Sequence, residues 1–190
     1  KQLSQTFGCC RYVYNHFLEL RKKTWRDEKR SLTYDDCSEK LTSLKEEYPW
    51  LKEVSSVPVQ QTLRHLDRAF QNFYKKIARY PSFRAKHTTQ SATFMKNAFT
   101  YKNNEITLAK QKDPLCIVWS RRFSGDPTSL TITKDGRDHY YISLLVKEEI
   151  QSLPFKKKEI GLDLGLMNLL MDDAGNGIKR EPFLKKEQKK

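Results

Sequence analysis

Residues 159–171 read EIGLDLGLMNLLM, an apolar run in which Asp163 is the only interior acidic residue and a glycine stands two positions to either side. An uncompensated carboxylate among apolar neighbours costs several kcal/mol, and a divalent metal ion is the usual compensation. The spacing predicts a strand through Asp163, a turn at Gly165, a return strand over residues 168–171 and a second turn at residues 173–177. The run therefore predicts an antiparallel meander with a metal-binding aspartate. The simpler alternative is a hairpin whose aspartate accepts hydrogen bonds from turn amides.

The rest of the chain is strongly basic. Its 190 residues carry 36 Lys and Arg against 23 Asp and Glu, a formal net charge of +13. Such an excess indicates a polyanionic partner, with nucleic acid first, whereas an acidic membrane surface or plain solubility is the alternative. A hydrophobic content of 37% allows a modest core and argues against disorder. No apolar run approaches the roughly 20 residues of a membrane span, and no signal peptide is visible.

The four cysteines do not suggest a zinc site, because no two of them form a C-x-x-C pair. Cys9 and Cys10 follow a helical pattern and are expected to be small buried thiols, as in a reduced cytoplasmic protein. The chain starts without methionine and ends in KKEQKK. We interpret it as a fragment of a longer protein.

Residues 1–78 are predicted to be helical. Apolar side chains recur at intervals of three and four along residues 7–25 and again along residues 59–77, which indicates two packed helices. Between them, Thr33 is the predicted N-cap of a second helix, with Asp36 completing a capping box. Pro58 suits the first turn of the third helix.

From residue 79 to residue 155 the pattern changes to short strands, predicted at residues 91–94, 105–108, 116–119, 129–133 and 140–146. An Asp-Gly pair at Asp135 predicts a hairpin between the last two. Several short strands separated by turns favour a small barrel or a sandwich over a parallel sheet. The predicted fold class is α+β, with three domains at residues 1–78, 79–155 and 156–190.

The order of motifs resembles the TnpB family of transposon-encoded RNA-guided DNA endonucleases, which are related to compact type V CRISPR effectors. Four sets of residues carry this likeness over essentially the whole chain. Residues 7–18 (FGCCRYVYNHFL) resemble the first helix of the family. Residues 41–45, 50–51 and 67–74 resemble its other recognition helices, residues 80–87 (YPSFRAKH) its P-x-F-(K/R)-x-K segment, and residues 161–169 its first RuvC motif.

The resemblance implies a helical recognition lobe, a wedge β-barrel and the first strands of an RNase H-like RuvC domain. It implies a guide RNA and target DNA beside a short target-adjacent motif as partners, and a cytoplasmic, nucleoid-associated location in a prokaryote. Asp163 takes the place of the first catalytic carboxylate, which holds Mg²⁺. The later carboxylates and the zinc-binding cysteine pairs of the family have no counterpart within residue 190, so we expect this chain alone not to cut DNA.

Eight candidate nucleic-acid-binding residues follow. Arg84 and Lys86 stand beside two aromatic residues, as in single-strand sites, although a solvated loop is the simpler interpretation. Arg121 and Arg122 follow a predicted strand and could grip RNA or simply be exposed. By position in the family pattern, the residues expected to meet the target-adjacent duplex are Tyr34, Ser56, Gln60 and Lys96; glutamine can read adenine in the major groove.

Two other functions stay open. One is a nuclease-inactive repressor or decayed gene remnant that binds nucleic acid only, although a descendant freed of catalysis need not keep Asp163. The other is a strand-transfer transposase, which shares the RNase H core but not the helical and wedge motifs.

Overall fold

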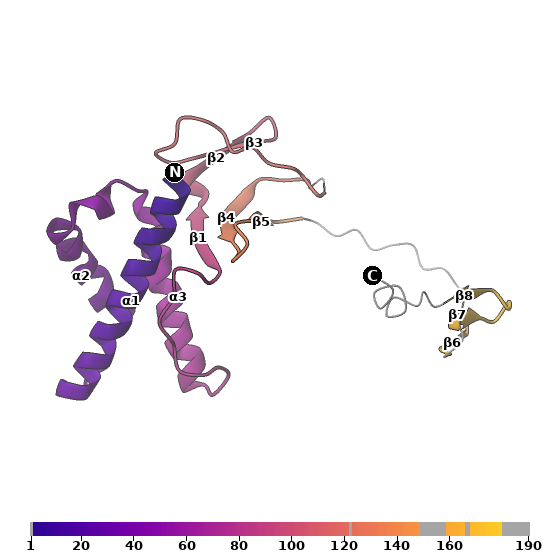
Figure 1. Cartoon of the computed structure of the whole chain (residues 1–190), viewed down its shortest axis with the longest axis horizontal. Coiled ribbons are helices and arrows are strands. Elements are labelled where there is room, and N and C mark those ends of the chain that lie inside the picture. Colours follow the sequence, from indigo (N-terminus) through magenta and orange to yellow (C-terminus); the bar gives the residue numbers. More distant parts are fainter. Residues whose placement is uncertain (1, 122, 149–158, 166–167, 180–190) are drawn as a thin grey trace. The chain divides into compact units, whose positions relative to one another are not determined.

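The computed structural model describes residues 2–121, 123–148, 159–165 and 168–179 (Figure 1). The chain divides into two compact units, residues 1–149 and 150–190. The described parts are α+β, as predicted, and are taken in turn below.

Three helices make up the amino-terminal half of the first unit: α1 (Gln2–Glu28), α2 (Tyr34–Glu47) and α3 (Ser56–Tyr74), with a 3-10 turn η1 (Pro49–Lys52). The predicted capping box of α2 is confirmed, because Asp36 donates its amide hydrogen to the Thr33 hydroxyl and its carboxylate accepts from the Thr33 amide. Pro58 lies in the first turn of α3. The third helix ends earlier than predicted, since Lys76 adopts a left-handed conformation with φ of 60°.

The β-part contains one three-stranded antiparallel sheet in the order β1 (Gln90–Met95), β4 (Pro127–Lys134) and β5 (Tyr140–Val146). Strands β2 (Phe99–Lys102) and β3 (Glu105–Leu108) form a separate hairpin. Two expectations fail: residues 116–119 form no strand, and β2 was not predicted. The described strands also form no closed barrel, so the predicted wedge barrel is not confirmed.

The β4–β5 hairpin forms where the Asp-Gly pair predicted it, but by another mechanism. The carboxylate of Asp135 accepts hydrogen bonds from the amides of Arg137 and His139 at 2.8 and 2.9 Å. The left-handed residue is Asp138, with φ of 66°, rather than Gly136. A side-chain cap therefore shapes this turn.

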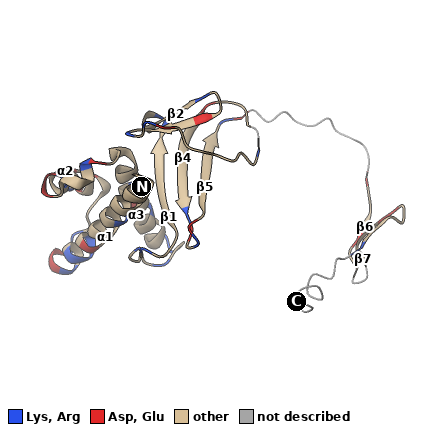
Figure 2. Cartoon of the chain, turned by 45° about the horizontal axis from the view of Figure 1, so that its top comes forward, with Lys and Arg blue, Asp and Glu red and all other residues tan. Residues whose placement is uncertain are grey.

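The first helix joins the helical and the β-parts. Val13, Phe17 and Leu18 are buried with α2 and α3 in one core cluster. Phe7 and Cys10 instead belong to a second cluster, which includes Phe94, Leu130 and Ile132 of the sheet. In Figure 2 the charged residues gather on helices and loops, while β1, β4 and β5 are tan over most of their length. Helices and sheet thus share a core within one compact unit, and the domain boundary at residue 78 stays a prediction.

The described part of the second unit is the predicted meander. Strands β6 (Leu162–Asp163), β7 (Asn168–Asp172) and β8 (Gly177–Lys179) pair antiparallel in that order. Asp163 lies opposite Met171. At the second turn, the Asp172 carboxylate accepts hydrogen bonds from the amides of Ala174 and Asn176. The RNase H-like fold that these strands were expected to begin stays a prediction.

Candidate nucleic-acid interface

The segment of residues 80–87 is fixed to the first helix by one asparagine. The Arg84 amide donates to Asn15 Oδ1 at 2.8 Å, and Asn15 Nδ2 donates to the Arg84 carbonyl oxygen at 3.0 Å. These two bonds satisfy both backbone groups of Arg84, a role that a single amide side chain can fill. Residues 69 positions apart in the sequence are thereby held together.

Arg84 is half-buried, and its guanidinium lies 3.9 Å from the ring centroid of Tyr14. A planar guanidinium on an aromatic face gains cation–π energy while its edge stays free to donate hydrogen bonds. Lys86 is exposed. Of the two predicted cations in this segment, Arg84 is therefore held in place, whereas Lys86 extends into solvent.

The pKa values of two side chains near Arg84, His65 and Cys10, are shifted mainly by burial. The pKa of His65 is lowered by burial and then by Arg84 and Arg68, so its imidazole is neutral at neutral pH. Burial also raises the pKa of Cys10 to about 11, which keeps this thiol protonated. The prediction that Cys9 and Cys10 are buried is confirmed. Cys37 is buried as well, whereas Cys116 is exposed.

A second group of predicted residues shares one face of α3. Ser56 and Gln60 are exposed and one helical turn apart, and Arg64 follows at the same interval. The guanidinium of Arg64 lies 4.8 Å from the ring centroid of Tyr34, at the start of α2. The structure thus brings Tyr34, Ser56 and Gln60 to one face through Arg64, which was not among the predicted site residues although its spacing of four from Gln60 could have found it.

Lys96 lies elsewhere, in the 3-10 turn η2 (Lys96–Ala98) after β1. Its ammonium is 3.8 Å from the Asp126 carboxylate, and both side chains are largely exposed. A surface pair of this length contributes little to stability.

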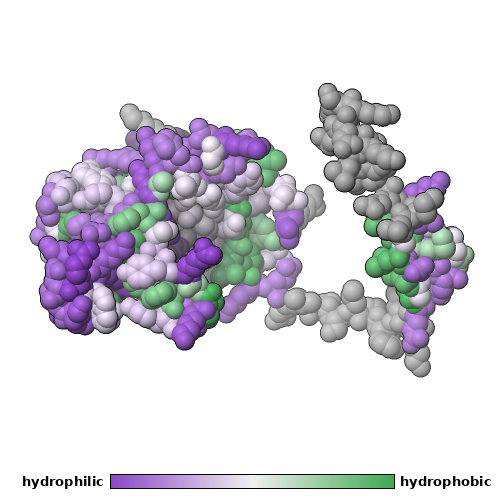
Figure 3. Space-filling model, turned by 60° about the horizontal axis from the view of Figure 1, so that its bottom comes forward, coloured by the Kyte–Doolittle hydropathy of each residue, from purple (hydrophilic) through white to green (hydrophobic). Residues whose placement is uncertain are grey.

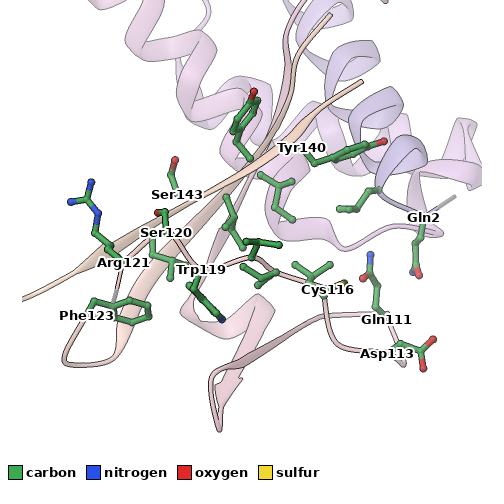
Figure 4. Close-up of a pocket in the computed structure, with 18 of the residues that line it drawn as sticks. Gln2, Gln111, Asp113, Cys116, Trp119, Ser120, Arg121, Phe123, Tyr140 and Ser143 are labelled. Carbon is green, nitrogen blue, oxygen red and sulfur yellow. The ribbon is translucent and has the colours of Figure 1, made fainter. Parts of the chain in front are cut away.

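A groove of about 1090 Å³ runs between β5 and the irregular segment of residues 111–121, with Phe123 also in its lining. Figure 4 shows Arg121, Trp119 and Phe123 on one side of the view and Gln2 and Asp113 on the other. Arg121 is exposed, and Arg122 lies outside the described residues. On the face shown in Figure 3, hydrophilic residues cover most of the first unit and a green hydrophobic patch lies toward its right-hand part.

Asp163 is exposed on β6, as are Leu162 and Leu164 beside it. The sequence argument for a metal ion assumed that the Asp163 carboxylate is buried among apolar side chains. In the described meander it is exposed, so there is no burial cost for a metal ion to compensate. Among the described residues, no group of three or more His, Cys, Asp or Glu side chains could hold a metal ion. The described residues alone therefore do not make up a complete metal site.

None of the helices in the described ranges combines the length and hydrophobicity needed to cross a bilayer.

Comparison with known proteins gives several matches. A family model described as a helix-turn-helix domain, of the OrfB/IS605 type, matches residues 1–30, which here contain the continuous helix α1. A candidate RNA-guided DNA endonuclease of Streptomyces pristinaespiralis is 41% identical over 182 residues, covering 93% of this chain and 45% of the relative. The candidate RNA-guided DNA endonuclease InsQ of Escherichia coli K12 is 26% identical over 193 residues, covering 96% of this chain and 46% of the relative.

A third match is the virulence protein VsdF of Salmonella dublin, 35% identical over 98 residues, which covers 46% of this chain and 82% of the relative. The chain spans about half the length of the two endonuclease relatives, 45% and 46%.

Proposed function

The chain belongs to the TnpB-type family of transposon-encoded RNA-guided DNA endonucleases, and from this premise we propose that it forms the nucleic-acid-binding part of such an enzyme. In this proposal its partners are a guide RNA and target DNA, and it works in the cytoplasm of a prokaryote at the nucleoid. The observation that supports it most is the basic segment of residues 80–87, clamped by Asn15 onto α1, with Arg84 stacked on Tyr14.

The two groups of residues receive different roles. Arg84 and Lys86, with Arg121 and Arg122, contact RNA phosphates. Tyr34, Ser56 and Gln60 meet the duplex beside the target, where Gln60 reads a base edge, and Lys96 contacts the same duplex. The finer domain assignment, a wedge barrel followed by a RuvC nuclease domain, is part of this proposal.

The first test measures RNA binding against salt concentration. Each neutralised phosphate adds about 0.7–0.9 to the slope of log affinity against log salt. Changing Arg84 and Lys86 to alanine should flatten the slope by roughly one to two units. A matched control removes the same charge at Lys40 and Lys102, which are exposed on α2 and β2. Equal slopes in the parent and the Arg84/Lys86 variant would exclude this segment from the RNA surface.

For the complete protein we propose Mg²⁺-dependent phosphodiester hydrolysis with Asp163 as one metal ligand. The further carboxylates would have to come from residues other than those described, so this 190-residue chain with guide RNA, matching DNA and Mg²⁺ should not cleave above background. In a longer protein that does cleave, Asp163→Asn should abolish cutting and leave guide-dependent DNA binding intact. Cutting at the parental rate by that variant would end the assignment. Loss of DNA binding as well would point to a structural role.

A further inference from the structure

Three aromatic side chains at the end of α3 and in the segment after it are exposed: Tyr74 by 61%, Tyr80 by 44% and Phe83 by 51%. We name Tyr74, Tyr80 and Phe83 the aromatic surface. One exposed aromatic ring needs no explanation, whereas several within ten positions of the sequence mark a binding surface.

The orientation of Tyr80 is fixed by the two rings that it packs against. Tyr80 packs edge-on against Phe70 and Phe73, with ring centroids 5.5 and 5.1 Å apart and interplanar angles of 88° and 81°. Phe70 is buried. The Asn15 clamp on Arg84 fixes the backbone just after Phe83. A ring that is already oriented loses little conformational entropy when a flat ligand stacks on it.

Positive charge surrounds the aromatic surface. The Lys22 ammonium, from α1, lies 4.2 Å from the ring centroid of Phe83 and 5.8 Å from that of Tyr80. Residues 75–87 contain no acidic residue and five Lys and Arg: Lys75, Lys76, Arg79, Arg84 and Lys86. Glu19 is the acid close enough to affect Tyr80, whose pKa is raised by burial first and by Tyr74 and Glu19 to a smaller extent.

Exposed aromatic rings surrounded by positive charge favour one class of ligand over others. A protein partner could also pack on exposed aromatic rings, but it would need acidic groups to match these cations. A duplex offers phosphates but keeps its bases stacked inside. Unpaired bases present both a flat aromatic face and a charged backbone, which is how single-strand sites combine stacking with a basic groove.

We propose that Tyr80 and Phe83, with Lys22 beside them, stack unpaired bases of a single-stranded nucleic acid while the cations of residues 75–87 contact its backbone. This inference rests on the proposed function, and it adds that part of the ligand is unpaired at this surface. Stacking tolerates any base and either sugar, so an unpaired stretch of guide RNA and a displaced DNA strand are both possible sources.

The experiment measures fluorescence anisotropy with an oligouridylate and an oligothymidylate of about 12 nucleotides, within the site sizes of single-strand-binding proteins. An RNA hairpin with the same number of phosphates is the third probe. Phe83→Leu and the double variant with Tyr80→Leu remove flat faces but keep apolar bulk. Tyr141→Leu is the matched control, since Tyr141 is 56% exposed on β5 and makes no contact with Lys22.

The double variant should bind the single strands about ten-fold more weakly, with Phe83→Leu alone accounting for part of the loss. Its salt slope should equal the parent's, because no phosphate contact is removed, whereas Lys86→Gln, which removes one of the backbone-contacting cations, should lower the slope by about 0.7. Hairpin binding and the Tyr141→Leu control should not change. The relative loss on oligouridylate and on oligothymidylate then identifies the source of the unpaired strand.

Parental single-strand affinity in Phe83→Leu and in the double variant would overturn the proposal, as would an equal loss on the hairpin. Phe83 is half exposed, so its single variant should keep the parental melting temperature even if Tyr80→Leu lowers it. If the parent binds no RNA probe in a salt-dependent way, the proposed function fails as well. If hairpin binding is retained and the Phe83 and Tyr80 variants bind single strands with parental affinity, only the stacking proposal is contradicted.

Discussion

Removing the carboxylate of Asp67 should destabilise the first unit, because it leaves a buried cation without its partner. Arg21 is on α1, with 6% of its side chain exposed, and its Nη2 atom donates to Asp67 Oδ1 on α3 at 2.8 Å. The same guanidinium donates to Cys37 Sγ of α2 at 3.5 Å and lies 4.9 Å from the Phe70 ring centroid. One side chain therefore contacts all three helices.

The expected loss in the free energy of unfolding follows from the burial of this ion pair. Breaking a buried ion pair from one side costs about 3–5 kcal/mol. Because the Asp67 side chain keeps 22% of its exposure, we expect Asp67→Ala near the lower end, about 3 kcal/mol. For a unit of this size, that corresponds to a fall in melting temperature of roughly 6–12 °C.

Thermal unfolding followed by circular dichroism measures the effect, and a second variant tests its cause. Replacing both partners, Arg21→Met with Asp67→Leu, removes the uncompensated charge and should recover most of the loss. Asp126→Ala is the control for an exposed pair, since Lys96 and Asp126 are 68% and 81% exposed and should contribute little. A fall of less than about 2 °C for Asp67→Ala would refute the reasoning.

Two further predictions concern stability. Thr33→Ala removes the N-cap of α2, and urea denaturation should show a loss of about 1 kcal/mol in the free energy of unfolding. The pKa of its partner Asp36 is lowered mainly by hydrogen bonds from the Thr33 amide and hydroxyl. The Asp36 carboxylate should therefore stabilise the fold above its ordinary pKa, and this contribution should be lost as pH falls through the lowered pKa. The unfolded chain protonates His65 before the folded one does, so stability should decline as pH falls below about 6.5. Unfolding measured against pH should lose that component in His65→Gln, and a parental pH profile in the variant would contradict it.

Local signals accounted for much of the fold. Thr33 and Asp36 set the start of α2 through bonds made within four residues, and the meander around Asp163 follows from alternation and turn residues. Such features depend on neighbours in the sequence, so their prediction needs no knowledge of packing.

Predictions failed where tertiary contacts decide. The apolar pattern of α3 continues to Ile77, yet the helix stops at Tyr74 and Ile77 is 72% exposed. Residues 116–119 have strand-like composition, but in the described structure they line a groove beside β5 without pairing to it. Strand propensity indicates a fit to a half-buried surface, and a neighbouring strand must be present for pairing to occur.

At the candidate interface, too, local contacts could be predicted from the sequence and tertiary contacts could not. Gln60 and Arg64 could be placed together because helical spacing is local. Lys22 could not be placed over Phe83, nor Asn15 beneath Arg84, since each contact joins α1 to a segment more than sixty positions away. Sequence identified the chemical type of the surface, basic and aromatic, and the fold decided which cation meets which ring.

For Asp163, the sequence pattern predicted the position in the fold but not the chemical environment. Its place on β6 follows from the local pattern, and the paired strands bear that out. Its chemistry was inferred from apolar neighbours on the assumption that they are buried, but Leu162, Leu164 and Leu169 are 55%, 76% and 54% exposed in the described meander. Three strands of two, five and three residues are too few to bury an apolar face. Asp163 would be enclosed only when further structure packs on the meander, so any metal binding by this carboxylate depends on an assembled site rather than on its strand.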